Sequence, residues 1–385
     1  MNVLVLDNAP FVGGAQVNLR HMARLLGAMG HEVTVAVPDD RDEPAAYYRD
    51  AGGHAVGVPM RSLNGTSPLL ARSLARSLGH LRRLVREGGA QVTFASGQRT
   101  GVLAVLLRYV AGIPAVWRLC DLGFARRVRV ASCFADRITC VSDALYRRYR
   151  HGWHARDTRI VHTGVWAERL DRDELQRRRL HMRRALGIED GNVVVGAVSN
   201  LQRWKGLHVL VEAFAQVARQ VPEARLVHVG GPAPGFVTYP GYVRSLVERL
   251  AVGDRCRFLG FQPDVLRYYA AFDVFAHTPI YENGERHSEA FGQVVAEAMA
   301  YRLPVVAADI GGVPEVVARG ETGILVETGD VDGTARALRR VLDAPDLRRD
   351  LGENGFARFL GRFTIEREAA EYEALFEDAV RSWSR

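Results

Sequence analysis

The sequence predicts two α/β domains in tandem, each built on a doubly wound, Rossmann-like parallel sheet. The 385 residues exceed what one hydrophobic core usually supports. Short apolar runs alternate with helical patterns along the whole chain, as in parallel strands joined by crossover helices. We therefore expect an N-terminal domain at 1–170, a connector at 171–190 and a C-terminal domain at 191–365. A last helix at about 366–385 could pack back on the first domain.

The apolar runs give the expected strands of each domain. The first series is 3–6, 32–37, 91–95, 115–119, 137–141 and 159–162. The polar, arginine-rich segment that follows is helical in pattern and separates this series from the next. The second series is 193–198, 225–229, 255–259, 274–277, 304–307 and 323–326. The alternation predicts that every strand within a series runs parallel to its neighbours.

Composition indicates an ordinary globular enzyme, with 48% hydrophobic and 25% charged residues. The chain enters an apolar strand at once, without a basic leader, so we expect a cytoplasmic protein. No apolar run is long enough to span a membrane. The four cysteines form no metal-binding spacing and are expected to be reduced thiols. We expect no bound metal, and neither Asp-x-Asp triplet lies where a metal would be needed.

Positive charge is concentrated between residues 122 and 184, which hold 16 Arg against 7 Asp and Glu. Such a surface attracts anions, and it is usually a solvated arginine-rich face. No nucleic-acid-binding motif occurs, and stacking aromatics are sparse. A peripheral membrane contact through the first domain remains an alternative. The segment 70–86 has the period of an amphipathic helix with arginines on one side, which suits either a membrane surface or a protein core.

One cation stands out because Lys205 is the only lysine in the chain. It follows the strand 193–198, in the sequence Gln-Arg-Trp-Lys-Gly. An ammonium is a compact point charge, unlike the planar guanidinium that serves elsewhere in this chain. At a turn between a strand and a helix, such an ammonium suits the binding of a phosphate. Taken alone, Lys205 is equally consistent with a lysine that was retained by chance on a solvated face.

The segment 288–300 is the second candidate site. Phe291 and Gly292 lead into a helix that should begin near Gly292, and a helix start offers free N–H groups to an anion. Glu289 precedes this start and Glu297 lies two turns into the helix. Since carboxylates repel phosphate, the two glutamates should instead accept hydrogen bonds from sugar and ribose hydroxyls.

A glycine pair, Gly13 and Gly14, follows the first strand, and further pairs lie at 230–231 and 311–312. Paired glycines let a backbone approach a ligand closely. The first pair does not complete the G-x-G-x-x-G fingerprint, which disfavours a nicotinamide dinucleotide. Ligands of such sheets bind beyond the carboxyl ends of the strands. We therefore expect the two domains to face a central cleft lined by these elements.

These motifs together resemble family 4 of the glycosyltransferases. The resemblance rests on Glu289-Ala-Phe-Gly with Glu297 eight residues later, on Gly311-Gly-Val-Pro-Glu, and on the Lys205-Gly206 step. It covers nearly the whole chain. It implies the GT-B fold and a nucleotide-sugar donor as co-substrate, most often a UDP-sugar. It also implies retention at the anomeric carbon, no metal and no other cofactor.

The resemblance also implies roles for the donor-site residues. Lys205 would bind the donor diphosphate, beside the backbone of Gly13 and Gly14, and Glu289 would contact the transferred sugar; these two would carry catalysis. Glu297 would hold the ribose. Backbone donors would come from Phe291, Gly292 and Gln293.

Two positions depart from the family pattern. The family often has an arginine where this chain has Asn200, and Arg203 is near enough to take its place. The family also commonly has a histidine after the strand 115–119, where this chain reads Arg118, Leu119, Cys120, Asp121. We name Arg118, Cys120 and Asp121 as candidate sugar or acceptor contacts. The alternatives are a local ion pair for the two charged residues and a small buried side chain for the cysteine.

The sequence therefore predicts a retaining glycosyltransferase that moves a hexose or N-acetylhexosamine to a glycan, a lipid-linked or a natural-product acceptor. A mannosyltransferase using GDP-mannose is one alternative. A sugar-nucleotide epimerase of the same fold is another, and a non-catalytic sugar-nucleotide sensor is a third.

Overall fold

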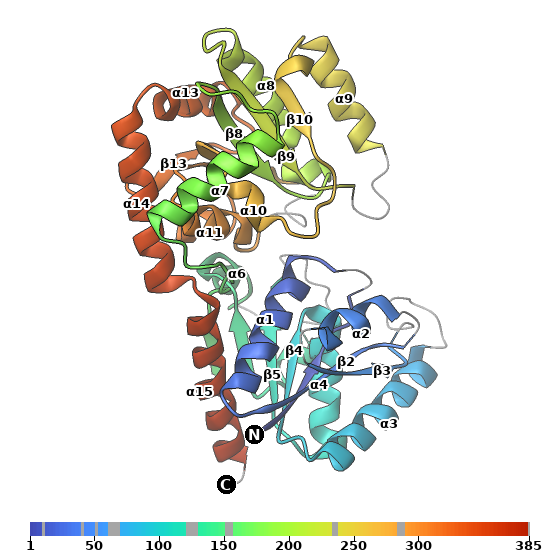
Figure 1. Cartoon of the computed structure of the whole chain (residues 1–385). Coiled ribbons are helices and arrows are strands. Elements are labelled where there is room, and N and C mark those ends of the chain that lie inside the picture. The colour runs from blue at the N-terminus through green and yellow to red at the C-terminus, as the bar shows by residue number, and fades with distance from the viewer. Residues whose placement is uncertain are drawn as a thin grey trace. The chain divides into compact units, whose positions relative to one another are not determined.

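The computed structural model describes residues 1–9, 12–39, 42–50, 53–60, 70–120, 130–150, 157–232, 238–282 and 289–383. The chain forms two compact units (Figure 1). The first unit combines Met1–Trp166 with Thr364–Arg385, and the second is Ala167–Phe363. The predicted domain limits at residues 170, 190 and 365 do not coincide with these divisions of the chain, and they stay a prediction.

The first unit is built on a parallel sheet of seven strands among its described residues, in the order β3-β2-β1-β4-β5-β6-β7. The strands alternate with helices, which cover both faces of the sheet (Figure 1). The strands are β1 (Asn2–Leu6), β2 (Glu32–Pro38), β3 (His54–Val58), β4 (Val92–Ser96), β5 (Ala115–Leu119), β6 (Arg137–Cys140) and β7 (Asp157–Ile160). The helices are α1 (Gly14–Ala28), α2 (Asp42–Arg49), α3 (Leu70–Gly88), α4 (Gln98–Ala111), α6 (Asp143–Tyr149) and α15 (Ile365–Trp383).

Alternation along β1 shows how this sheet separates two apolar layers. Val3 and Val5 belong to one buried cluster, and Leu4 and Leu6 belong to another. Successive side chains of a strand point to opposite faces, so both faces of β1 are buried. The first cluster includes α1 and α15, and the second includes α3 and α4.

The last helix, α15, is part of the first unit although it follows the whole second unit in sequence. Its apolar residues recur at helical spacing and give one buried stripe. The stripe includes Ile365, Ala369, Tyr372, Phe376 and Ala379, all in the same cluster as β1 and β4. The burial of this stripe is what returns the chain end to the first unit.

The second unit is built on a parallel sheet of six strands among its described residues, in the order β10-β9-β8-β11-β12-β13. The strands are β8 (Val193–Val198), β9 (Ala224–Val229), β10 (Cys256–Phe258), β11 (Val274–His277), β12 (Val305–Ala308) and β13 (Gly323–Val326). The longer helices are α7 (Arg172–Ala185), α8 (Leu207–Ala218), α9 (Tyr239–Arg249), α11 (Gln293–Ala300), α13 (Val331–Leu342) and α14 (Pro345–Arg362). The short ones are η3 (Arg203–Lys205), η4 (Gly253–Arg255), α10 (Leu266–Tyr269) and α12 (Val313–Val316).

The prediction of two doubly wound parallel sheets is confirmed. Every predicted strand is present within two residues of its expected limits. One strand, β3, was not predicted. Its sequence, His-Ala-Val-Gly-Val, is short and includes a glycine, so its apolar signal is weak. It forms because β2 offers it a paired edge, in register from Thr34↔His54 to Pro38↔Val58.

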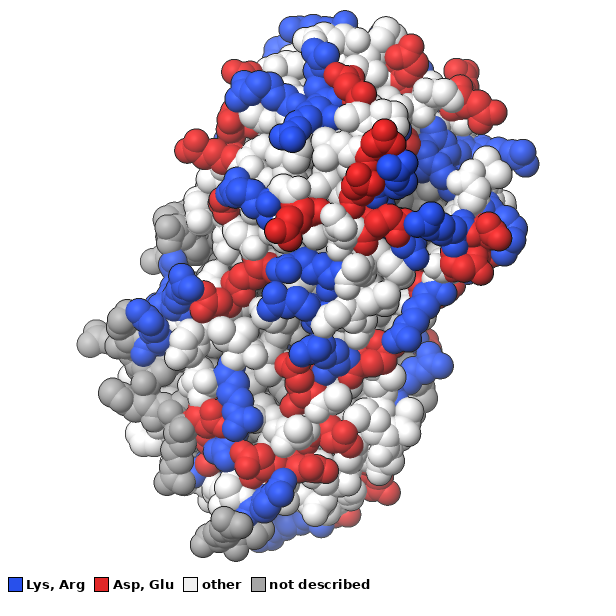
Figure 2. Space-filling view, turned by 90° about the vertical axis from the view of Figure 1, so that its left-hand side faces the viewer, with Lys and Arg blue, Asp and Glu red and all other residues white. Residues whose placement is uncertain are grey.

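The surface carries mixed charge on the face that Figure 2 presents, where Lys and Arg alternate with Asp and Glu. The segment 70–86, predicted as an amphipathic helix, lies within α3. Within the described ranges, the helices are all too short or too polar to cross a bilayer.

Candidate functional site

Lys205 lies in a tight turn that joins the end of β8 to the start of α8. Residues 203–205 form a single turn of 3₁₀ helix, closed by Gly206 at φ +68°. A side chain at Gly206 would place its Cβ 1.7 Å from the carbonyl oxygen of Thr278, so only glycine fits. The hydroxyl of Thr278 donates to the Gly206 carbonyl oxygen at 3.0 Å. The glycine thus ties the lysine turn to the end of β11, the strand beside β8.

The structure brings Lys205 and Glu289 together, although 84 positions separate them in sequence. The Lys205 ammonium donates to Glu289 Oε2 at 2.7 Å. The same oxygen lies 3.1 Å from His277 Nε2, at the end of β11. A hollow of about 10 Å³ adjoins Lys205 and His277. This cluster therefore lies at the carboxyl edge of the sheet, where open α/β sheets bind ligands.

Electrostatics keep Glu289 ionised. Burial by itself raises the pKa of this carboxyl, but the Lys205 ammonium and the His277 hydrogen bond outweigh it and hold the pKa well below its usual range. Burial also lowers the pKa of His277, which favours a neutral imidazole. Since an ionised carboxylate only accepts hydrogen bonds, the Nε2 of His277 carries the proton in this contact.

The helix start next to Glu289 is formed as predicted. Gly292, at φ +98°, is the N-cap residue of α11, which begins at Gln293. Gly312 donates its N–H to the Glu289 carbonyl oxygen at 3.0 Å, and a side chain there would collide with the Ala290 backbone. Phe291 is buried with its ring against Phe363. The glycine pair after β12 therefore fixes the backbone that aims the first N–H groups of α11 at the carboxyl edge.

Glu297 lies on α11 and has a partner that sequence reasoning missed. The hydroxyl of Tyr269 donates to Glu297 Oε2 at 2.6 Å. Burial raises the pKa of the Glu297 carboxyl, and the Tyr269 hydrogen bond opposes that rise. His277, the second side chain in contact with Glu289, was not predicted either. Neither residue carries a local motif, so nothing in the sequence near them signals these contacts.

The remaining predicted residues of the second unit lie around the lysine turn and the helix start. Asn200 is exposed, and Arg203 is exposed with its guanidinium 5.8 Å from the Tyr242 ring. Gln293, the first residue of α11, is half-buried. Arg203 therefore extends toward α9 in this structure, and its predicted share in phosphate binding stays a hypothesis.

The glycine loop of the first unit follows β1 as predicted. Gly13 is the N-cap residue of α1, and Gly14 begins the helix. The amide of Gly13 donates to Gln16 Oε1 at 3.1 Å, and the Gln16 amide donates to Asp7 at 3.1 Å. Burial raises the pKa of the Asp7 carboxyl, which Tyr48 also contacts through its hydroxyl at 2.8 Å. Asp7, missed in the sequence, anchors the loop to the end of β1.

Arg118 is wholly buried in the first unit. Its Nη1 donates to Asn18 at 2.5 Å, and its Nη2 donates to Thr163 at 3.0 Å and lies 3.3 Å from Glu368 of α15. Among the described residues, the carboxylate partner of Arg118 is Glu368. The suggested ion pair between Arg118 and Asp121 involves a residue outside the described ones and stays a prediction. Its described contacts are those of a structural residue, and the predicted contact of Arg118 with a sugar or an acceptor stays a prediction.

Cys120, next along the chain, is half-buried, with its sulfur 3.9 Å from the Ser96 hydroxyl. Asp121 lies outside the described residues. The replacement of the family's histidine at this loop therefore stays a prediction.

The donor-site cluster can bind an anion and a hydroxyl-bearing group together. A positive ammonium and the N-terminal end of α11 attract negative charge. The ionised Glu289 accepts hydrogen bonds from hydroxyls. Among the described residues, His, Cys, Asp and Glu side chains form no group of three that could hold a metal ion.

Comparisons with known proteins show the family of the chain. A model of glycosyl transferases group 1 matches residues 179–358, and a model of Glycosyltransferase Family 4 matches residues 12–169. The chain is 31% identical over 381 residues to N-acetyl-alpha-D-glucosaminyl L-malate synthase of Bacillus anthracis, covering 97% of this chain and 96% of that protein. It is 36% identical over 209 residues to D-inositol 3-phosphate glycosyltransferase of Corynebacterium diphtheriae. That match covers 53% of this chain and 47% of the relative.

Solved structures share the fold over the full chain. The crystal structure of Anabaena HepE in complex with UDP has a TM-score of 0.83 and 25% identity, covering 98% of this chain and all of that one. Sucrose-phosphate synthase from Thermosynechococcus elongatus has a TM-score of 0.80 at 22% identity, covering 99% of both chains. None of these relatives supports the epimerase alternative. The fold is GT-B, and the chain is a glycosyltransferase of family 4 that transfers sugar from a nucleotide-sugar donor to an acceptor.

Proposed function

We propose that this protein is a retaining, metal-independent transferase that moves N-acetylglucosamine or a hexose from a UDP-sugar to an acceptor hydroxyl. The observation that carries the proposal is the Lys205–Glu289 contact of 2.7 Å beside the N-terminus of α11. This contact joins the Lys205 ammonium, a cation for the diphosphate, to the Glu289 carboxylate, an anion for the sugar hydroxyls, by a single hydrogen bond. The two groups suit the two halves of a nucleotide sugar.

The chemistry assigns a task to each group. The bond from the anomeric carbon to the diphosphate breaks, and its electron pair goes to a phosphate oxygen. The acceptor oxygen bonds to the anomeric carbon, and its proton leaves to the departing diphosphate. The Lys205 ammonium and the backbone N–H groups of Phe291, Gly292 and Gln293, at the start of α11, stabilise the charge that develops on the diphosphate.

The other groups orient the donor. Glu289 accepts hydrogen bonds from the hydroxyls of the transferred sugar. Glu297, held by Tyr269, accepts hydrogen bonds from the ribose. The backbone of Gly13 and Gly14 remains a candidate contact of the diphosphate. Asn200 and Arg203 remain the candidate neighbours of the phosphates on the lysine turn.

The relatives support the finer choices of donor and stereochemistry. HepE structures hold UDP and UDP-glucose. The Bacillus anthracis relative is named for an α-linked N-acetylglucosaminyl product. Because UDP-N-acetylglucosamine carries its sugar in α linkage, an α product retains the configuration of the donor. Its name also makes L-malate the first acceptor to test, and D-inositol 3-phosphate is the second.

The test combines a donor panel with these two acceptors. The full chain is incubated with UDP-N-acetylglucosamine, UDP-glucose, GDP-mannose or ADP-glucose, and glycoside and free nucleotide are measured by mass spectrometry. We expect glycoside and UDP in equal amounts from one UDP-sugar. The proton spectrum of the product should show the small coupling of an α-anomeric proton.

Other results would contradict parts of the proposal. A β-anomeric product would overturn retention, and turnover of GDP-mannose alone would overturn the choice of UDP. An epimerised UDP-sugar formed without acceptor would overturn transfer itself.

A further inference from the structure

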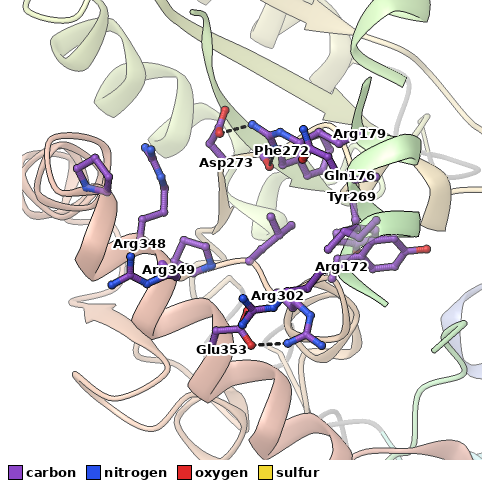
Figure 3. Close-up of a pocket in the computed structure, with 16 residues that line it drawn as sticks. Arg172, Gln176, Arg179, Tyr269, Phe272, Asp273, Arg302, Arg348, Arg349 and Glu353 are labelled. Carbon is purple, nitrogen blue, oxygen red and sulfur yellow. Dashed lines mark hydrogen bonds and ion pairs between the residues drawn. The ribbon is translucent and has the colours of Figure 1, made fainter. Parts of the chain in front are cut away.

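The second unit carries a pocket that no step of sugar transfer uses. It has a volume of about 320 Å³ and opens between α7, the start of α14 and the amino ends of β11 and β12 (Figure 3). Phe272 and Asp273 line it just before β11, and Leu303 and Pro304 line it just before β12. Since the strands are parallel, this is the edge opposite to the one that carries Lys205 and Glu289. The pocket therefore opens at the other edge of the sheet from Lys205 and Glu289, although Tyr269 in its lining also donates to Glu297.

Positive charge dominates the lining. Figure 3 shows arginines around the hollow, with Arg348 and Arg349 on α14 across from Arg172 and Arg179 on α7. Asp273 and Glu353 supply the only carboxylates among the lining residues. The arginines of the lining are Arg172, Arg179, Arg302, Arg348 and Arg349. The five lining arginines therefore outnumber the two lining carboxylates.

Most of these arginines already have carboxylate partners. Arg179 donates to Asp273 at 2.5 Å, and Arg183 outside the pocket shares that carboxylate at 3.1 Å. Glu353 pairs with both Arg172 and Arg302. These pairs fix the walls and orient their guanidinium groups at the rim of the hollow.

Arg349 is also paired, at 2.9 Å with Asp346 and at 3.3 Å with Asp350, two acids that lie outside the lining.

Arg348 differs from the others. Within the described part of the chain it has no carboxylate partner, and its Nη1 has one backbone acceptor, the Leu342 carbonyl oxygen at 3.3 Å. It is half-buried. It also lies in the first turn of α14, an 18-residue helix whose N-cap, Ala344, offers no side-chain cap. A cation beside the positive end of a helix is unfavourable, and Asp346 offsets only part of it. An anion here would pair with Arg348 and offset this unfavourable charge.

The remaining walls are apolar and aromatic. The rings of Tyr269 and Tyr301 stack with centroids 5.6 Å apart, and Leu175 and Phe272 complete this side. A volume of about 320 Å³ lies at the lower end of small-molecule sites, roughly 300–1,000 Å³. The pocket thus fits a compact ligand with one charged end and one ring-like or aliphatic end.

We propose that this pocket is a second anion site of the protein, which binds a compact phosphorylated compound of one or two phosphate groups. The phosphate would lie between Arg348 and the N-terminus of α14, with Arg302 and Arg179 flanking it. The proposal does not depend on which donor or acceptor the enzyme uses.

The test is a calorimetric titration of the full chain with orthophosphate, diphosphate and glucose 6-phosphate in separate runs. Glucose 6-phosphate tests the contribution of the ring wall. Lys205→Ala removes the cation of the donor site, so binding that survives in this variant belongs elsewhere. We expect Lys205→Ala to keep one binding event and Arg348→Glu to weaken it at least tenfold. Arg348→Gln should weaken it less and covers the case in which the glutamate variant does not fold.

Arg219→Glu is the matched control, because it makes the same change of charge at an exposed arginine outside the pocket lining. It should leave the affinity unchanged. Three outcomes would overturn the proposal: no binding of any of the three compounds to Lys205→Ala, equal affinity in folded Arg348→Gln and the parent chain, or an equal loss in Arg219→Glu.

Discussion

Each unit of the molecule contains a buried glutamate that faces one cation, and the two pairs differ in what surrounds them. In the first unit, Arg118 and Glu368 are 2% and 0% exposed in their side chains. Glu368 accepts from Asn18 at 2.6 Å and from the Gly164 amide at 2.8 Å. Protein groups therefore enclose this pair. It closes a network that joins α15 to β5.

In the second unit, Lys205 and Glu289 are 17% and 12% exposed. Their pair lies at the carboxyl edge of the sheet, beside a small hollow and the N-terminus of α11. These surroundings shift the pKa values of the two carboxyl groups in opposite directions. Burial raises the pKa of Glu368, and Arg118 opposes that rise only in part. Lys205 and His277 together lower the pKa of Glu289. The comparison teaches that an ion pair serves structure when protein groups enclose it and can serve a ligand when one side is open.

The largest effect is expected from breaking the enclosed pair. Arg118→Met leaves Glu368 without its cation in a dry environment, which should lower the free energy of unfolding by roughly 3–5 kcal/mol. Denaturant melts of the full chain measure it. The double variant Arg118→Met, Glu368→Gln should recover part of the loss because no uncompensated charge remains. A single variant as stable as the parent chain would show that the pair has no structural role.

Breaking the open pair should affect catalysis more than stability. Lys205→Ala removes the cation proposed for the diphosphate, and we expect kcat/KM to fall by about 10²–10³-fold. Its unfolding free energy should fall less than that of Arg118→Met, because water reaches the vacated site. Steady-state kinetics with the active UDP-sugar and the same melts compare the two variants. Unchanged turnover would remove Lys205 from the donor site.

A charge-conserving change sharpens the role of the ammonium. Lys205→Arg keeps the positive charge but replaces a compact group with a planar fork, so we expect a loss of about tenfold in kcat/KM. Arg225→Lys, at a surface position on β9, is the matched control and should not alter kinetics. Full activity in Lys205→Arg would mean that only the charge matters.

Stability against pH should separate the two glutamates by sign. The pKa of Glu289 is lowered on folding, so its contribution is present above the unfolded pKa of about 4.3 and is lost as pH falls below it. The pKa of Glu368 is raised, so its contribution is present below that unfolded value and is lost as pH rises from there through the raised folded pKa.

The measurement is a set of melts between pH 3 and 7 for the parent chain, Glu289→Gln and Glu368→Gln. The stability difference from the parent should shrink with falling pH for the first variant and change in the opposite direction for the second. The same slope in both would refute the contrast.

The smallest effect is expected from chelation. If Lys205 and the N-terminus of α11 carry the positive charge for the diphosphate, dialysis against EDTA leaves kcat/KM unchanged. Magnesium added afterwards should not raise it. A tenfold loss that magnesium restores would assign part of that charge to a metal.

Local patterns predicted much of this molecule. The strands of both sheets were predictable because apolar β-branched runs bury on both faces of a parallel sheet. The start of α11 was predictable because a glycine that adopts a positive φ marks it. β3 was missed because its stability comes from pairing with β2 rather than from its own residues.

The partners of the site residues were not predictable. His277 and Tyr269 carry no motif, and they act only because β11 and α10 bring them to Glu289 and Glu297. Arg118 was predicted as a candidate sugar or acceptor contact, with a local ion pair as the alternative, whereas its acidic partner comes from the far end of the chain. Asn18 and Glu368, in contact at 2.6 Å, are 350 residues apart.

The sequence by itself determined the two sheets, the turn that ends in Gly206 and the chemical groups of the donor site, because each depends on residues close together in the chain. The tertiary structure decided which cation meets which carboxylate. Lys205 meets Glu289 because Gly206 closes against Thr278 and the neighbouring strands β8 and β11 end side by side. Arg118 meets Glu368 because the apolar stripe of α15 buries against the first sheet. The charge of a side chain determines which interactions it can make. Packing between residues far apart in the sequence determines whether that side chain is enclosed by protein or open to a ligand.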